Sequence, residues 1–511
     1  MAVSAAALAI ALSAGPEPLG NAAVAAPGCS GAGSDFNGDG FRDTAVADPQ
    51  ATVNGIAKAG VVHIVYGGGA GTLELTQEAA KAGPSEADDA FGHALAVYDA
   101  DLDGCADLAI GTPYEDVGTQ VDSGRVVVVY GAPAGLGAGR TTTEYVQQTA
   151  PLAAIAAEAY DWFGYSVTAG KTAGGVPFMA AGMPGEDIGT GIDAGAFVYF
   201  SGSTTVTAGV VNQDVSTTAG AVPDAVESYD RFGEVLVATP HYLAASSPGE
   251  AQGTLEEAGA VTIFNHALTS NVPKPLNAIT QDSPNVNGGC EFDDGFGTAL
   301  AAVTPFTSAA VGPKLLLAVG IPGEDLTADV GLSTEYLAVD GGAVQVFSID
   351  SAGAYTEENW IDQDSADVED KVEAGDYFGR SIVAHTEPGP NLIHLAVGVP
   401  GQDVDGVVDR GAVQIFTAYS APGTSDRLLE PGVEIPAPAG PRLYTGLNIG
   451  DGANGLYVGL PYGPPEGHAV HVYAWPASRG ATTWRDTPSS TFRPGEGGLP
   501  AEHKTFGTVV R

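Results

Sequence analysis

Basic residues, cysteines and long apolar runs are all scarce in this sequence. Its 511 residues include 19 lysines and arginines against 62 aspartates and glutamates, which gives a net charge of −43. A surface this acidic repels phosphate backbones, so nucleic acid is not expected as a partner, whereas bound cations suit it. No segment reaches the run of about 18 apolar residues that a membrane-spanning helix requires, so no span is expected.

Motifs of the common enzyme classes are also missing. The nine histidines fall in no zinc or metalloprotease pattern, and there is no GxSxG elbow, P-loop or dinucleotide-binding fingerprint. The basic residues are scattered, whereas an enzyme should bring His, Tyr or Arg side chains together near a channel. We therefore predict no catalytic residues and no catalytic role.

The first 26 residues are typical of an export signal. Residues 5–12 form a short apolar run, and Ala23-Val24-Ala25 offers small residues for cleavage. No Lys or Arg precedes the apolar run, which departs from the usual pattern. We predict a signal peptide at 1–26, a single domain at 27–511, and a monomer that is secreted or held at the cell surface.

Glycine, by contrast, is abundant, and a repeat runs through the chain. The 72 glycines and 34 prolines favour many short strands joined by tight turns. The first part of the repeat is a Phe-Gly pair with an aspartate two positions before it. The pairs begin at Phe91, Phe163, Phe232, Phe296 and Phe378, and their aspartates are Asp89, Asp161, Asp230, Asp294 and Asp376.

Two more parts complete the repeat and occur seven times, five of them after a Phe-Gly pair. A short apolar stretch ends in proline, at Pro49, Pro113, Pro184, Pro248, Pro322, Pro400 and Pro461. A glycine then begins a β-branched run, at Gly60, Gly124, Gly195, Gly259, Gly342, Gly411 and Gly467. Such runs have the composition of buried strands. A fourth strand is expected before each Phe-Gly, for example at 144–149 and 277–282.

Four strands per unit in seven units predict an all-β fold, a seven-bladed β-propeller of four-stranded antiparallel blades. The first unit begins at Asp35 and lacks a Phe-Gly strand. Residues 506–511 form such a strand with no unit after it. Because an unpaired sheet cannot bury both of its faces, we predict that this C-terminal strand completes the first blade and closes the ring.

These linked elements resemble the FG-GAP repeats of integrin α-subunit heads and of many secreted bacterial proteins, over nearly the whole mature chain. The resemblance implies a calcium-binding module for adhesion or ligand binding. It also implies that the acidic loops between the second and third strands form a ligand-binding face opposite the calcium loops. Those loops run from Glu115 to Asp122, Glu186 to Asp193, Glu250 to Glu257, Glu324 to Asp340 and Asp403 to Asp409.

Two loops carry the residues that calcium requires. Their candidate ligands are Asp35, Asn37, Asp39, Phe41 and Asp43 in loop 1, and Asp99, Asp101, Asp103, Cys105 and Asp107 in loop 2. Oxygen side chains occupy positions 1, 3, 5 and 9, glycine at position 6 permits a sharp turn, and the residue at position 7 offers its backbone carbonyl. We therefore expect two Ca²⁺ ions.

The two loops differ from an EF-hand and from the integrin arrangement. Val46 and Ile110 stand where an EF-hand has its last glutamate, so the loops resemble the nine-residue loops of FG-GAP proteins. Integrin heads typically carry such loops in later blades, whereas this chain has them in its first two units. That difference argues against transferring the ligand specificity of integrins.

Cys29 lies just before loop 1, and Cys105 lies within loop 2. A disulfide between them would fix the N-terminal segment if the first two blades are neighbours. Three cysteines leave other pairings open, including any with Cys290.

The expected partner is an unidentified extracellular protein or glycan. The alternative is a glycan-active lyase or hydrolase on the same scaffold, because a catalytic carboxylate pair could be hidden among so many acidic residues. A merely solvated acidic face is a further possibility.

Overall fold

The computed structural model describes residues 29, 31, 33–153, 155–217, 220–305, 312–328, 336–387, 392–424, 426–452, 454–475 and 487–511. The signal peptide predicted at 1–26 lies outside the described residues. Within the described part of the chain, no helix has both the length and the apolar character needed to cross a membrane.

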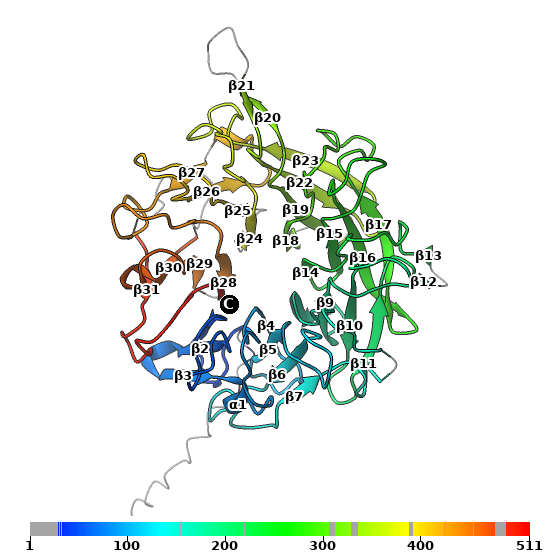
Figure 1. The fold of residues 1–511 in the computed structure, drawn as a ribbon, viewed down its shortest axis with the longest axis vertical. Helices are drawn as coiled ribbons and strands as arrows, with labels where there is room; N and C mark the ends of the chain where they lie inside the picture. The colour runs from blue at the N-terminus through cyan, green and yellow to red at the C-terminus, as the bar shows by residue number, and fades with distance from the viewer. Residues whose placement is uncertain are drawn as a thin grey trace, which may run out of the picture.

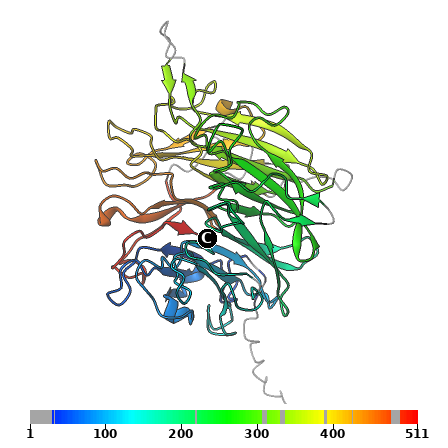
Figure 2. The same cartoon turned by 45° about the vertical axis from the view of Figure 1, so that its right-hand side comes forward.

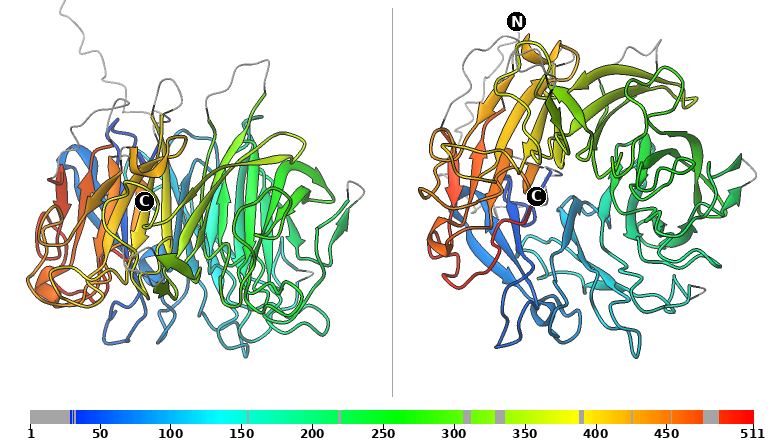
Figure 3. Two further views of the ribbon diagram at one scale, coloured as in Figure 1. Left: turned by 90° about the horizontal axis from the view of Figure 1, so that it is seen from above. Right: turned by 45° about the horizontal axis from the view of Figure 1, so that its top comes forward.

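Seven four-stranded antiparallel sheets surround a central axis as the blades of a propeller (Figure 1). Seen from the side, the ring is a thick disc whose strands run across its thickness (Figure 3). The predicted fold class is therefore confirmed.

Each blade has its first strand at the axis and its last strand at the rim. In that order, blade 1 has β32 (Val509–Val510), β1 (Thr44–Asp48), β2 (Val61–Tyr66) and β3 (Gly71–Leu75). Blade 2 has β4 (Ala94–Tyr98), β5 (Asp107–Thr112), β6 (Arg125–Val129) and β7 (Thr143–Tyr145). Blade 3 has β8 (Val167–Lys171), β9 (Pro177–Met183), β10 (Ala196–Ser201) and β11 (Thr207–Val211). Blade 4 has β14 (Leu236–Ala238), β15 (Tyr242–Ser247), β16 (Ala260–Thr269) and β17 (Val272–Ile279).

The remaining blades follow the same order. Blade 5 has β18 (Ala299–Val303), β19 (Leu315–Ile321), β22 (Ala343–Ile349) and β23 (Tyr355–Ile361). Blade 6 has β24 (Ser381–Glu387), β25 (Leu392–Val399), β26 (Ala412–Thr417) and β27 (Arg427–Leu429). Blade 7 has β28 (Ile449–Gly452), β29 (Gly455–Leu460), β30 (Ala469–Tyr473) and β31 (Ser490–Phe492).

A few small elements lie outside the blades. Strands β12 (Ser216–Thr217) and β13 (Gly220–Ala221) form one hairpin, and β20 (Leu326–Ala328) and β21 (Tyr336–Ala338) form another. The second hairpin projects from the rim of the disc (Figure 2). The helical segments of the described chain are α1 (Gln77–Ala80) and three 3-10 turns at Gly67–Gly69, Pro422–Thr424 and Pro465–Gly467.

The C-terminal strand closes the ring, as predicted. Strand β32 pairs with β1, where Val46 lies opposite Val510 and Ala47 lies opposite Val509. Each innermost strand contacts the innermost strand of the next blade, and β32 contacts both β28 and β4. The first and last segments of the chain therefore share one sheet.

The glycines of the repeat allow each blade to meet the next. Gly124 has a φ of +89°, and a Cβ atom there would collide with the backbone of Phe163, which precedes the first strand of blade 3. A Cβ at Gly111 would collide with the carbonyl oxygen of Gly164 in the same way. Phe163 itself is fully buried between the blades. The repeated glycines and phenylalanines are thus explained by contact between blades.

Two of the expected fourth strands end earlier than predicted. The segment expected at 144–149 forms β7 over Thr143–Tyr145, and the one expected at 277–282 forms β17 over Val272–Ile279. Gln147 and Gln281, which follow these strands, are both buried and donate hydrogen bonds to residues of the next blade. The backbone leaves the strand ladder where these side chains enter the blade interface.

Candidate functional site

Loops 1 and 2 lie side by side and are joined through their backbones. The N–H of Ala106 donates to the carbonyl of Asp35 at 2.9 Å, and the N–H of Ala132 donates to the carbonyl of Phe36 at 3.0 Å. Loop 2 connects β4 with β5. Loop 1 is in the equivalent place before β1, but the strand on the inner side of β1 is β32, which comes from the C-terminal end of the chain. The two loops thus form one continuous region beneath blades 1 and 2.

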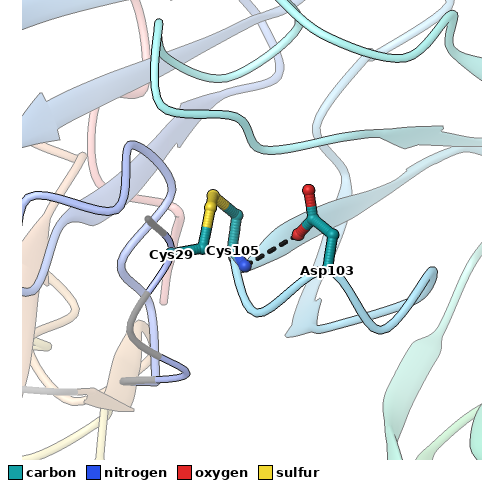
Figure 4. Close-up of side chains that lie close together, drawn as sticks. All are labelled: Cys29, Asp103 and Cys105. Carbon is teal, nitrogen blue, oxygen red and sulfur yellow. Dashed lines mark hydrogen bonds between the residues drawn. A yellow bond between two sulfur atoms is a disulfide. The ribbon is translucent and has the colours of Figure 1, made fainter. Parts of the chain in front are cut away.

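A disulfide joins Cys29 to Cys105 and fixes the N-terminal segment against loop 2 (Figure 4). The N–H of Gly31 adds a hydrogen bond of 2.8 Å to the carbonyl of Gly104. This pairing, left open by the sequence, is the one that the structure contains, and Cys290 is a buried free thiol. Because the sulfur of Cys105 is bound to Cys29, only the backbone of Cys105 is left to act as a ligand.

The last aspartates of the two loops, Asp43 and Asp107, have equivalent surroundings. Asp43 accepts hydrogen bonds from the N–H groups of Phe36 and Gly67, both at 2.8 Å. Asp107 accepts them from Ala100 at 2.7 Å and Gly131 at 2.8 Å. Burial nevertheless raises the pKa of Asp43 to about 6 and that of Asp107 to about 7, and the neighbouring loop carboxylates add to the rise. A cation would favour the charged form of both.

The carboxylates of loop 2 gather around a common point. One oxygen each of Asp99, Asp101 and Asp107 lies within 4.8 Å of the others, and this separation is about twice a Ca²⁺–oxygen distance. Asp99 Oδ1 is buried and has no hydrogen-bond partner. Lys171 Nζ lies 3.1 Å from Asp99 Oδ2, and an arginine lies 3.5 Å from Asp101 Oδ2. All of these candidate ligands are oxygen atoms, and one of them has no hydrogen-bond partner, so the group fits a hard divalent cation.

The carboxylates of loop 1 are held by their own backbone. Asp35 accepts from the N–H groups of Asp39 at 3.2 Å and Gly40 at 3.0 Å, while Asp39 accepts from Phe41 at 2.8 Å. Asn37 Oδ1 accepts from the N–H of Asp39 at 3.0 Å. Among the described residues, loop 1 has no triad of carboxylates as tight as that of loop 2. Loop 1 forms a sharp turn, and its candidate ligands accept hydrogen bonds from the backbone of the loop.

The acidic loops lie on the opposite face of the disc from loops 1 and 2. Strand β5 begins at Asp107 in loop 2 and ends at Thr112, just before the acidic loop of blade 2. Parts of these loops are structural, since Asp116 accepts a hydrogen bond of 3.0 Å from the N–H of Asp122. The first glutamates of four of these loops do not point out from the ligand-binding face as expected. Glu115, Glu250 and Glu324 are buried, and these three and Glu186 accept hydrogen bonds from glutamines in the blade interfaces.

Side chains near the axis on this face form an arrangement that sequence reasoning missed. The residue after each Phe-Gly lies one or two positions before an innermost strand. The residues in this equivalent position are His93, Tyr165, Glu234, Thr298 and Arg380. The rings of His93 and Tyr165 are 4.7 Å apart, and Tyr114 and Trp162 extend the cluster. The register after Phe-Gly was the signal that could have revealed this group.

A cavity of about 280 Å³ continues the arrangement across blades 4, 5 and 6, and we call it the axial pocket. Its lining includes Arg231, Glu234, Thr298, Tyr377 and Arg380. Arg231 pairs with Glu234 at 2.9 Å. Two basic residues that are far apart in the sequence, Arg231 and Arg380, therefore meet at the axial pocket.

The family model described as FG-GAP repeat matches residues 91–129. Phosphatidylinositol-glycan-specific phospholipase D of Mus musculus is 36% identical over 105 residues, which cover 20% of this chain and 12% of that protein. The Rattus norvegicus protein of the same description is 37% identical over 109 residues, covering 20% and 13%. The matched part is thus about an eighth of the length of these relatives.

Solved structures are similar to this chain only at low identity and with TM-scores below 0.5. A putative 6-phosphogluconolactonase from Bacteroides fragilis is 11% identical, with 92% of this chain and 97% of that chain covered and a TM-score of 0.44. Sqt1 of Saccharomyces cerevisiae is 9% identical, with 78% and 75% covered and a TM-score of 0.40. Similarities this weak carry no argument about the activity of this chain.

Proposed function

This chain is a β-propeller built from FG-GAP repeats, and we propose that it is a calcium-stabilised module that binds an extracellular protein or glycan. The predicted export signal and the disulfide between Cys29 and Cys105 support a location outside the cell or at its surface, where disulfides persist. The module has no catalytic role in this proposal.

The axial pocket is the observation that carries the proposal. It combines two arginines with Glu234 and Tyr377 in a concave site. Tyr377 is 41% exposed, and Tyr229 on the same face is 55% exposed. Exposed aromatic rings beside arginines are the groups that dominate protein interfaces and that stack on ligand rings. The axial pocket therefore has the chemistry of a recognition site.

Calcium has an architectural role in this proposal. Loops 1 and 2 lie on the face opposite the axial pocket, so a cation there would act on the fold rather than on the ligand. Bound Ca²⁺ would neutralise the clustered carboxylates of Asp99, Asp101 and Asp107 and hold blades 1 and 2 together.

A glycan-active lyase or hydrolase is the second candidate. The observation that favours it is the convergence of His93 and Tyr165 beside the axial pocket that contains Arg231 and Arg380, since such groups act as acids, bases and charge stabilisers. Release of products from a polysaccharide would distinguish it from a binding module.

The test is a screen of matrix proteins and glycans with the chain lacking residues 1–26, run with calcium and with chelator. We expect a hit whose affinity falls about tenfold or more in Arg380→Ala, as for an interface contact of roughly 1.4 kcal/mol or more. Arg442→Ala removes an arginine that is not part of the axial pocket and should bind like the unmodified protein. Turnover of a polysaccharide without stable binding would overturn the proposal in favour of the second candidate.

A further inference from the structure

Polar side chains are buried between blades 3 and 4, at the end of the interface that carries the acidic loops. Gln213 follows β11 of blade 3, and Glu250 follows β15 of blade 4. Gln213 Nε2 donates to Glu250 Oε2 at 2.8 Å. Asp230, which precedes the Phe-Gly pair of blade 4, accepts from the N–H of Glu227 at 2.8 Å. We call these four residues the interblade cluster.

Three carboxylates of the interblade cluster approach one another closely. One oxygen each of Glu227, Asp230 and Glu250 lies within 4.8 Å of the other two. Asp230 is 1% exposed and Glu250 is 2% exposed, whereas Glu227 opens to solvent. Carboxylates this close repel each other strongly unless a cation or a proton lies between them.

The interblade cluster also contains buried oxygen atoms with no partner. Asp230 Oδ1 and Gln213 Oε1 are buried without a hydrogen bond, and Gln213 is only 4% exposed. An unsatisfied buried oxygen costs free energy, so each such atom calls for a ligand. The charged groups beside Glu250 include Asp230 and Asp224, which are both acidic.

The equivalent interface between blades 1 and 2 contains a positive charge. There Gln77 Nε2 donates to Glu115 Oε2 at 2.7 Å, as Gln213 does to Glu250. Arg125 Nη2 lies 2.5 Å from Glu115 Oε1. Arg125 is the first residue of the third strand of blade 2, β6, and the first residue of the third strand of blade 4, β16, is Ala260. Blade 4 thus has no arginine beside Glu250 that corresponds to the arginine beside Glu115 in blade 2.

The interface between blades 5 and 6 has no buried carboxylate at the position equivalent to Glu250. Gln402 stands where blade 4 has Glu250, and it accepts a hydrogen bond of 2.6 Å from Gln363. One blade interface therefore has an arginine beside the buried glutamate, and another has a glutamine in place of that glutamate. Among the described residues, the interface between blades 3 and 4 has neither of these two changes.

We propose that the interblade cluster binds one divalent cation, with Glu227, Asp230 and Glu250 as carboxylate ligands and Gln213 as a further oxygen donor. All the donors are oxygen, which selects a hard cation such as Ca²⁺ over a thiophilic metal. The exposed side chain of Glu227 provides the route of entry. The site is separate from loops 1 and 2, and it does not depend on the axial pocket.

The same residue types recur in two further interfaces. Blades 2 and 3 meet at Gln147, Glu158, Asp161 and Glu186, and blades 4 and 5 meet at Gln281, Glu291, Asp294 and Glu324. Asp161 Oδ1 and Asp294 Oδ1 are also buried without a partner. Among the described residues, the interblade cluster differs from these two sets because one oxygen of each of its three carboxylates lies within 4.8 Å of the other two. It is therefore the site to test first.

The experiment counts calcium bound per chain by equilibrium dialysis against ⁴⁵Ca²⁺, comparing the full chain with Glu250→Gln. This substitution copies Gln402 and should lower saturation binding by one ion per chain. Glu256→Gln makes the same change on an exposed residue of the same loop and should leave the number unchanged.

Ala260→Arg is the second variant, since it copies the arginine of blade 2 and should also remove one ion without removing any ligand. It decides the question if Glu250→Gln fails to fold by circular dichroism. Equal calcium binding by the unmodified chain and by the folded variants would overturn the proposal, and the interblade cluster would then share a proton instead.

Discussion

Asp48 accepts hydrogen bonds from both the backbone N–H and the hydroxyl of Thr505, at 2.7 and 3.0 Å, although 457 positions separate them in the sequence. The contact fixes the C-terminal segment on the first blade just before it enters the sheet as β32. The ring is closed by such contacts between the two ends of the chain, so its stability depends on the last residues.

Phe506→Ala should destabilise the whole ring. Phe506 is 1% exposed and packs with Val470 and Val510, which come from blade 7 and β32. Truncation of a buried phenylalanine costs about 3–5 kcal/mol, which urea unfolding would measure. Phe292→Ala, at a side chain that is 63% exposed, is the control and should change stability by less than about 0.5 kcal/mol. Equal stability of the two variants would argue against closure.

His63 should make ring closure sensitive to acid. Its ring lies 5.6 Å from that of Phe506, and burial lowers its pKa from 6.5 to about 4. The unfolded chain therefore binds a proton at higher pH than the folded protein does. The contribution of His63 to stability is complete above about pH 6.5 and is lost as pH falls towards 4, by roughly 3 kcal/mol at most.

The variant His63→Gln isolates this effect from the many carboxylates that titrate in the same range. The difference in unfolding free energy between the unmodified chain and His63→Gln should shrink between pH 7 and pH 4. A difference that stays constant across this range would show that His63 does not titrate as a buried group.

Removal of the disulfide should destabilise the N-terminal region. Cys29 and Cys105 are 76 positions apart, and closure of a loop of that length is worth roughly 4 kcal/mol in the chain-entropy model. The variant with both cysteines changed to alanine should unfold at lower urea, whereas Cys290→Ala keeps the bond. Peptide mapping without reductant should recover Cys29 linked to Cys105, and a link to Cys290 would contradict the structure.

The sequence was sufficient to predict the ring because its signals are local and repeated. Phe163, Gly164 and Gly124 each recur at a fixed place in the repeat, and the lone strand at 506–511 indicated closure. The ligand spacing of loops 1 and 2 was equally local. The repeat elements and the spacing in the loops can each be found within one unit of the chain, whereas closure follows from comparing the two ends of the chain.

Features that depend on contacts between blades were not predictable in this way. Arg231 and Arg380 belong to different blades and meet only in the axial pocket. Glu186 belongs to an acidic loop that the resemblance placed on the ligand-binding face, yet it lies in a blade interface, where burial raises its pKa to about 8. Gln147 looked like part of a strand, although it bridges two blades. A single unit contains no information about which side chain of the next unit lies opposite.

Calcium should stabilise the folded chain through loops 1 and 2. At a free concentration about 100 times the dissociation constant, one site adds roughly 2.7 kcal/mol. A variant with Asp39→Asn and Asp103→Asn removes one carboxylate from each loop and should lose most of this gain. A response equal to that of the unmodified chain would place the stabilising ion elsewhere.

The most direct test is the thermal unfolding of the unmodified chain in chelator and in millimolar calcium. We predict that the unfolding temperature is several degrees higher with calcium and falls again when chelator is added. Identical unfolding temperatures in the two solutions would contradict a calcium-stabilised propeller.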